Sequence, residues 1–264
     1  MYNYDKRNLK IGGFMQRYFI ENEQMVDGEV IITGEDVHHI RDVMRGRVGD
    51  NVILCTCDKV SYLVEIVDLN QMEVKFKVVE KRIEFVELPI LVTIAQGITK
   101  GDKFDFVLQK ATECGASEFI PVAMKRSIAK IDAKKADKKV FRWRKIAMEA
   151  ARQAHRQIVP SVGMPIDMKD LIQMAMRYDV CLFAYEACDT DNQQALADEI
   201  KKFETGMRVL ILIGPEGGID EVEVDVLRRA GFRAIGLGPR ILRTETAPIY
   251  VMSALSYALE IEGR

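Results

Sequence analysis

Residues 208–247 read RVLILIGPEGGIDEVEVDVLRRAGFRAIGLGPRILRTETA, and this stretch decides the fold of the chain. The run 209–213 is uninterruptedly apolar, as is typical of a parallel strand covered on both faces. It ends at the loop 214–218, after which Asp220 and Glu223 have the spacing of a helix capping box. A second strand over 233–237 leads to another glycine loop. The stretch therefore predicts a strand, a loop, a helix, a strand and a loop.

The two glycine loops follow the carboxyl ends of successive strands, which form the edge of an α/β sheet where ligands bind. A single glycine loop is a weak signal, so two ordinary connections remain the alternative interpretation. A dinucleotide-binding fold needs GxGxxG after its first strand and an acidic residue at the end of its second. This chain has GPEGG at the first position and Gly236-Leu237-Gly238 at the second, which excludes that class.

The side chains of the two loops favour one kind of chemistry. Their titratable groups are Glu216, Arg240, Arg243 and Glu245, without a Ser/His/Asp or Cys/His set. Such a site suits a reaction in which a cofactor supplies the reactive group and the protein aligns two partners. Arginine does not act as a general base, but it stabilises a developing anion. Salt bridges from the two arginines to Glu216 or Glu245 are the structural alternative.

The composition, with 48% hydrophobic and 30% charged residues among 264, is that of a globular protein with a sizeable core. No apolar run approaches the ~20 residues that span a bilayer. The N-terminus has no apolar signal-peptide core, so we expect a cytoplasmic protein without a membrane partner. Five cysteines without a CxxC pair and only three histidines predict reduced thiols and no metal site.

Charge is divided unevenly along the chain. Residues 15–88 hold 9 Lys and Arg against 15 Asp and Glu, and residues 161–264 hold 11 against 17. Residues 96–160 instead hold 15 against 7, a balance of +8. A polyanionic partner is therefore expected at the middle of the chain.

The pattern of secondary structure changes near Leu88-Pro89. Residues 1–14 are polar and aperiodic, and we expect a loose extension there. Short segments rich in Val, Ile, Phe and Tyr predict strands in a small sheet or barrel, at 16–20, 30–33, 51–57, 61–68 and 73–80. From residue 89 onward strands and helices alternate, which indicates a parallel sheet with covering helices. A helix is predicted over 36–44. It carries Arg41, and Arg45 follows it, so these arginines either contact phosphate or belong to a solvated helix face.

Further motifs resemble those of a known family. They are MQRYF (15–19), HHIR (38–41), VGD (48–50), TKGDK (99–103), QKATE (109–113) and RS (126–127), together with GPEGGI and LGPRILRTETA. On these motifs the chain, from Met15 to its C-terminus, resembles the RsmE-type ribosomal RNA methyltransferases of the knotted SPOUT superfamily.

This resemblance implies an α/β fold class with two domains. A small PUA-like RNA-binding β-barrel over 15–88 precedes a SPOUT α/β methyltransferase domain over 89–264 with a C-terminal trefoil knot. It also implies a homodimer and S-adenosyl-L-methionine bound in the knot loops. By position, the expected cofactor-binding residues are Leu212, Gly214, Gly218, Leu237, Gly238 and Leu242. Arg243 is the expected catalytic residue, and the expected RNA contacts are Arg17, Arg41, Arg45, Lys103, Arg126 and Arg142.

The implied reaction is methylation of N3 of a uridine in 16S ribosomal RNA of the small ribosomal subunit, with no role for DNA. N3 of uracil must lose its proton, and a cation such as Arg243 beside the uracil carbonyls favours the anion. N3 lies on the pairing edge, so the base must leave its pair before it reacts. Ribose 2′-O methylation and a non-catalytic RNA-binding assembly factor remain alternatives.

Overall fold

The computed structural model describes residues 15–129, 131, 133–185 and 195–262. The chain divides into two compact units, Met1–Phe85 and Val86–Arg264, each with its own hydrophobic core. This division lies three residues before the boundary expected between residues 88 and 89. The expected extension 1–14, Cys188 and the start of a helix expected from Gln193 lie outside the described residues.

The first unit is a six-stranded sheet in the order β1-β4-β5-β6-β3-β2. The strands are β1 (Arg17–Ile20), β2 (Met25–Val26), β3 (Glu29–Thr33), β4 (Asn51–Thr56), β5 (Ser61–Leu69) and β6 (Glu73–Arg82). Five of them lie where the sequence predicts strands, and β1 pairs with β4 in parallel. In the described residues the edge strands β1 and β2 are not paired with each other. The PUA-like β-barrel that we expected is therefore a half-barrel sheet.

Alternation along the strands builds the core of this unit. On β6, Val74 and Phe76 are fully buried, whereas Lys77 is exposed on the other face. The helical segment α1 (Glu35–His38) continues as a π-helical turn, His39–Val43, and buries Val37 and Ile40 against the sheet. The helix predicted over 36–44 is confirmed, with this change of helical type at its middle.

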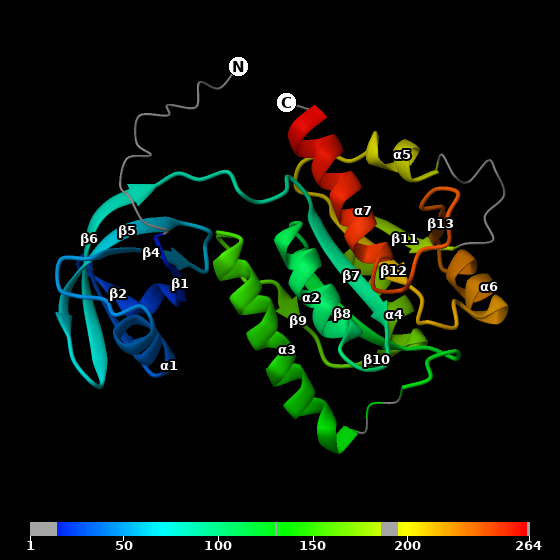
Figure 1. Ribbon diagram of the computed structural model, residues 1–264. Coiled ribbons are helices and arrows are strands. Elements are labelled where there is room, and N and C mark those ends of the chain that lie inside the picture. The colour runs from blue at the N-terminus through cyan, green and yellow to red at the C-terminus, as the bar shows by residue number, and fades with distance from the viewer. Residues whose placement is uncertain (1–14, 130, 132, 186–194, 263–264) are drawn as a thin grey trace. The chain divides into compact units, whose positions relative to one another are not determined.

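The second unit is a parallel sheet in the order β10-β8-β7-β12-β11-β13, with β9 beside β8 (Figure 1). Its strands are β7 (Leu91–Gly97), β8 (Glu118–Ala123), β9 (Ser161–Val162), β10 (Ile166–Asp167), β11 (Val180–Ala184), β12 (Arg208–Ile213) and β13 (Arg233–Ile235). Its helices are α2 (Lys103–Glu113), α3 (Ala133–Gln153), α4 (Met168–Met174), α5 (Ala195–Ile200), α6 (Glu221–Arg229) and α7 (Ala247–Ser256). Among the described residues, none of the helices is both long enough and apolar enough to cross a bilayer.

Strand β12 has helices on both faces, as its unbroken apolar run predicts. Val209, Ile211 and Ile213 pack into the cluster that contains residues of α2, α3 and α7. Leu210 and Leu212 pack into a second cluster with residues of α4 and α6. Because both faces are covered, polar residues at alternate positions would be buried without partners, which explains the continuous apolar sequence.

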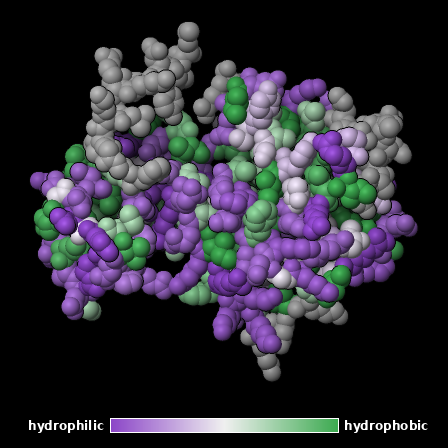
Figure 2. Space-filling model, in the orientation of Figure 1, coloured by the Kyte–Doolittle hydropathy of each residue, from purple (hydrophilic) through white to green (hydrophobic). Residues whose placement is uncertain are grey.

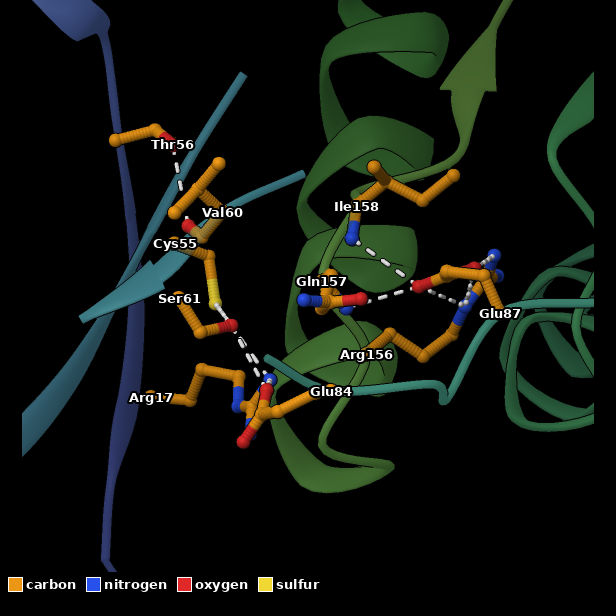
Figure 3. A network of polar contacts seen from close by, with 10 residues as sticks. All are labelled: Arg17, Cys55, Thr56, Val60, Ser61, Glu84, Glu87, Arg156, Gln157 and Ile158. Atoms are coloured by element: carbon orange, nitrogen blue, oxygen red, sulfur yellow. Dashed lines mark hydrogen bonds and ion pairs between the residues drawn. The ribbon is translucent and has the colours of Figure 1, made fainter. Parts of the chain in front are cut away.

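Each unit contains one buried arginine that holds a polar network (Figure 3). In the first unit, Arg17 donates hydrogen bonds of 2.8 and 3.1 Å to Glu84, which also accepts one from Ser61. In the second unit, Arg156 pairs with Glu87, whose Oε1 accepts the backbone N–H of Gln157 at 2.8 Å. These pairs satisfy charges that would otherwise be costly to bury.

The environment of Arg17 bears on one prediction. Its side chain is 4% exposed and pairs with Glu84, so the structure shows a structural role for Arg17 and leaves its contact with RNA as a prediction. Burial alone would raise the pKa of Glu84, but the hydrogen bonds from Arg17 and Ser61 outweigh it and the pKa lies below its ordinary value. The network therefore keeps a carboxylate ionised at the edge of the first unit.

Candidate active site

A cavity of about 560 Å³ opens at the carboxyl edge of the parallel sheet in the second unit. Both glycine loops line it, the first after β12 and the second after β13. Lys103 from α2 and Tyr185, which follows β11, complete its wall. The two loops that the sequence predicts at a ligand-binding edge thus enclose a single space of the size that small-molecule sites have.

The first loop, 214–218, is a tight turn fixed by its glycines. The N–H of Gly218 donates to Pro215 O at 2.9 Å. Gly218 has φ +72°, a backbone conformation that residues with a side chain rarely adopt. A Cβ on Gly214 would lie 2.9 Å from the Ile219 side chain. The loop then enters α6, where Asp220 and Glu223 form the predicted capping box.

The second loop, 236–246, returns from β13 to the first loop. Thr244 Oγ1 donates to Gly214 O at 2.6 Å and lies 2.8 Å from the donor Nε2 of Gln96. Gln96 is fully buried at the end of β7. Since these three residues come from β7 and both loops, their hydrogen bonds fix the two walls of the cavity against the sheet.

Charged side chains from three elements meet at the cavity. Lys103 Nζ lies 3.0 Å from Glu216 Oε1 and 3.8 Å from Glu245 Oε2. Glu216 Oε1 also accepts the Lys100 N–H at 3.0 Å. Arg243 Nη1 lies 3.9 Å from Glu245 Oε1, and the Arg243 side chain is 83% exposed. The expected pairing of Arg243 with Glu245 is thus loose, and Lys103 is the main partner of Glu216.

The same contacts shift the ionisation of Glu216. Burial would raise its pKa, but hydrogen bonds from its own backbone N–H and that of Lys100, together with the Lys103 ammonium, outweigh this effect. The pKa therefore lies below its ordinary value, and Glu216 is a fixed anion in the first loop.

Most of the predicted cofactor residues come together at this cavity. Gly214, Gly218, Leu237, Gly238 and Leu242 line it, as does Arg243. Leu212 does not line it, because its side chain is fully buried in the core cluster that contains residues of α4 and α6. Within the described residues, no group of three or more His, Cys, Asp or Glu side chains is arranged to hold a metal ion.

The predicted RNA contacts are scattered over both units. Lys103 is a cavity residue, and Arg126 lies beside the first glycine loop, with Nη1 3.4 Å from Gly217 O. Arg142 on α3 pairs with Asp105, and Arg41 pairs with Asp42 at 2.7 Å. Arg45 is exposed after the π-helical turn, with φ +54°. The structure leaves their contact with RNA as a prediction.

Three residues important to the site were missed by sequence reasoning. Gln96 and Thr244 join the two loops, and Gly97 approaches Pro215 so closely that a Cβ on it would lie 2.5 Å from Pro215 N. A polar residue followed by glycine at the end of an apolar strand was the available signal.

Comparison with known proteins agrees with this geometry. Residues 86–256 match a family model described as an RNA methyltransferase domain, and residues 32–79 match an RNA methyltransferase PUA domain. The chain is 44% identical to ribosomal RNA small subunit methyltransferase E of Bacillus subtilis, over 94% of this chain and 98% of that protein. The Mesomycoplasma hyopneumoniae protein of the same name is 32% identical, over 90% and 98%.

Solved structures have the same architecture. The methyltransferase E of Neisseria gonorrhoeae bound to S-adenosyl methionine has a TM-score of 0.79 at 27% identity, covering 93% of this chain and 98% of that one. A putative methyltransferase of Legionella pneumophila in complex with the same cofactor has a TM-score of 0.80 at 26% identity, with the same coverage. The chain, a PUA-like domain followed by a methyltransferase domain, therefore belongs to the ribosomal RNA small subunit methyltransferase E family of RNA methyltransferases.

Proposed function

We propose that this protein transfers the methyl group of S-adenosyl-L-methionine to N3 of a uridine in 16S ribosomal RNA. The observation that carries the proposal is the cavity of about 560 Å³ enclosed jointly by the two glycine loops. Relatives of the same fold are described with this cofactor bound. A charged rim with Arg243 beside the cavity suits stabilisation of a uracil anion.

The residues present fit the cofactor. Gly238 has φ +86°, and a Cβ on Gly214 would lie 2.9 Å from Ile219, so residues with side chains do not suit these two positions of the cavity wall. Leu237 and Leu242 offer apolar contacts for an adenine ring, and the polar loop backbone provides donors and acceptors. When bound, the cofactor's sulfonium supplies an electrophilic methyl group.

The protein's own part in this reaction is to hold the uridine in line and to stabilise its anion. The exposed Arg243 side chain lies at the cavity, where a base that has left its pair can enter. Its guanidinium stays charged and stabilises the negative charge that develops on the uracil carbonyls. Loss of one such donor typically costs about 10²–10³ in kcat.

We also propose that the C-terminal segment is threaded as a trefoil knot of the SPOUT type. The chain leaves β13 at the edge of the sheet, yet Thr244 bonds to Gly214 at the end of β12. Helix α7 then packs on the same face of the sheet as α2. A return from the edge strand to the middle of the sheet is the path that such threading requires.

An RNA-binding role is proposed for the basic middle segment. Along α3, Lys138, Lys139 and Arg142 are exposed, and Figure 2 shows mostly hydrophilic residues over the visible side of this helix. Together with Arg126 beside the first glycine loop, they offer cations to the RNA backbone. Arg41, Arg45 and Lys103 are the other proposed contacts.

A homodimer is proposed on the exposed apolar side chains of neighbouring helices. Phe106 on α2 and Tyr250 on α7 are 45% and 39% exposed, and Tyr257 in the turn after α7 is 56% exposed. Helices α2 and α7 are neighbours, and exposed large apolar groups on neighbouring helices are typical of an interface.

Nucleoside analysis of 16S ribosomal RNA from a strain that lacks this protein tests the proposal. We expect N3-methyluridine to disappear and to return when the gene is restored. Its persistence in the strain would contradict the proposal. Loss of a 2′-O-methyl nucleoside instead would favour the ribose methyltransferase, and unchanged nucleosides with defective subunit assembly would favour the assembly factor.

A further inference from the structure

Glu245 holds an unused hydrogen-bonding position at the cavity rim. Its Oε2 lies 3.8 Å from Lys103 Nζ and its Oε1 lies 3.9 Å from Arg243 Nη1. Both separations exceed a hydrogen bond, so neither cation donates to this carboxylate. In the described part of the chain, the buried Oε2 has no hydrogen-bond partner. Glu245 thus keeps the capacity to accept a proton donor from a bound molecule.

The other carboxylate at the cavity, Glu216, is engaged through one oxygen only, because its buried Oε2, like that of Glu245, has no hydrogen-bond partner in the described part of the chain. Its Oε1 accepts the backbone N–H of Lys100 and the ammonium of Lys103, both at 3.0 Å. These bonds stabilise its ionised form, which makes it a weak proton acceptor. An ammonium has three donors, so Lys103 retains donors for another partner while it holds Glu216.

The order of these groups matches one edge of one base. Glu245 has a cation near each of its oxygens, Lys103 Nζ at 3.8 Å and Arg243 Nη1 at 3.9 Å, so that a donor, an acceptor and a donor are neighbours. The pairing edge of uracil presents the complementary row, O2, N3–H and O4, which is acceptor, donor and acceptor. Cytosine presents an unprotonated N3 at the middle position, where it would face the carboxylate and be repelled.

We propose that Glu245 accepts the N3 proton of the target uridine while Lys103 and Arg243 donate to its two carbonyl oxygens. This assignment rests on the proposed uridine-N3 activity. The three groups then have two functions. Glu245 removes the proton, and Glu245, Lys103 and Arg243 together select uracil over cytosine. The terminal torsion of a glutamate side chain is broad, so either carboxylate oxygen can take the accepting position.

The proton transfer balances with the methyl transfer. The N3–H bond breaks as its proton passes to the Glu245 carboxylate, and the electron pair left on N3 forms the bond to the methyl carbon. The bond between that carbon and sulfur breaks, and its electron pair stays on sulfur, which leaves S-adenosylhomocysteine. The protonated Glu245 then releases its proton to water, which restores the carboxylate for the next turnover.

The test compares Glu245→Gln with a matched control, Asp225→Asn, which removes a carboxylate from the exposed middle of α6. The substrate is small subunits from a strain that lacks the protein. We expect Glu245→Gln to lower kcat by about 10²-fold or more, the usual contribution of a general base, and the control to match wild type. The Kd for S-adenosyl-L-methionine, measured by calorimetry, should be unchanged in both variants.

A second measurement addresses recognition. Subunits whose methylated uridine is replaced by cytidine should bind wild-type protein less tightly, and Glu245→Gln should lose this discrimination because an amide both donates and accepts. Glu245→Asp keeps the carboxylate and should recover part of the lost kcat, which a merely structural role would not predict. This variant also gives the answer if Glu245→Gln does not fold.

The two ways of failing are distinguishable. If wild-type protein forms no N3-methyluridine, the proposed function is wrong. If wild-type protein forms it and Glu245→Gln retains wild-type kcat and discrimination, the assignment of Glu245 is overturned. Equal loss of kcat in Glu245→Asp and Glu245→Gln, without loss of discrimination, would also overturn it.

Discussion

Replacing Gly97 by alanine tests whether the first glycine loop must sit where the structure places it. Gly97 ends β7, and a Cβ on it would lie 2.5 Å from Pro215 N and 2.6 Å from Pro215 Cδ. Real Cβ atoms essentially never approach other atoms this closely, and an ordinary contact begins near 3.4 Å. Pro215 would therefore have to retreat by about 0.9 Å, and the loop that lines the cavity would move with it.

The expected cost follows from this displacement. Overpacking of a well-packed site costs about 1–3 kcal/mol. If cofactor binding requires the loop in its original position, the same energy appears as a rise in Kd of about 5- to 150-fold. The φ of Gly97 is not in the left-handed region, so backbone strain does not add to this cost.

Calorimetry with S-adenosyl-L-methionine and thermal unfolding would measure the two effects. Gly163→Ala is the matched control in the same unit, because its Cβ would lie 3.7 Å from Phe119 O, an ordinary contact. We expect Gly97→Ala to bind the cofactor more weakly and to melt at a lower temperature than this control. Equal affinity and equal Tm for the two variants would refute the reasoning.

Three further predictions concern the buried networks and the cavity rim. Arg156→Ala leaves the partly buried Glu87 carboxylate without its cation and should lower the free energy of unfolding, measured with denaturant, by about 3–5 kcal/mol. Removing the exposed ion pair of Lys201 with Asp198 should lower it by at most about 1 kcal/mol. Because the pKa of Glu84 is lowered by folding, its contribution to stability is present above the unfolded carboxyl pKa of about 4.3 and is lost as pH falls. Glu84→Gln should therefore flatten the acid side of a Tm-versus-pH curve, and an unchanged slope would contradict the assignment. Arg243→Ala should lower kcat by about 10²–10³ with little change in cofactor Kd, and the reverse pattern would argue for a binding role.

Local patterns predicted most of the fold because they follow from burial alone. The unbroken run in β12 reflects two covered faces, and the alternation Val74-Lys75-Phe76 in β6 reflects one. The capping box at Asp220 is satisfied within one helical turn, so it too could be found in the sequence. Each of these signals depends only on residues that are neighbours along the chain.

What the sequence did not reveal depends on contacts between distant residues. The bond from Gln96 to Thr244 joins positions 148 residues apart, and no periodicity encodes it. Arg17 has the charge of an RNA contact, and its pairing with Glu84, 67 residues away, could not be predicted from the sequence. Pairing of the sheet edges is also a tertiary property, so the expected barrel and the observed half-barrel sheet have the same strand pattern.

The most direct test of the proposed function is methylation by the purified protein. Small subunits from a strain that lacks it would be incubated with S-adenosyl-L-methionine carrying a deuterated methyl group, and the nucleosides of the 16S RNA would be analysed by mass spectrometry. We predict that the label appears in N3-methyluridine, at one equivalent per subunit at most. Label in a 2′-O-methyl nucleoside would contradict the proposed uridine-N3 activity. So would the absence of label from the RNA when the protein binds S-adenosyl-L-methionine.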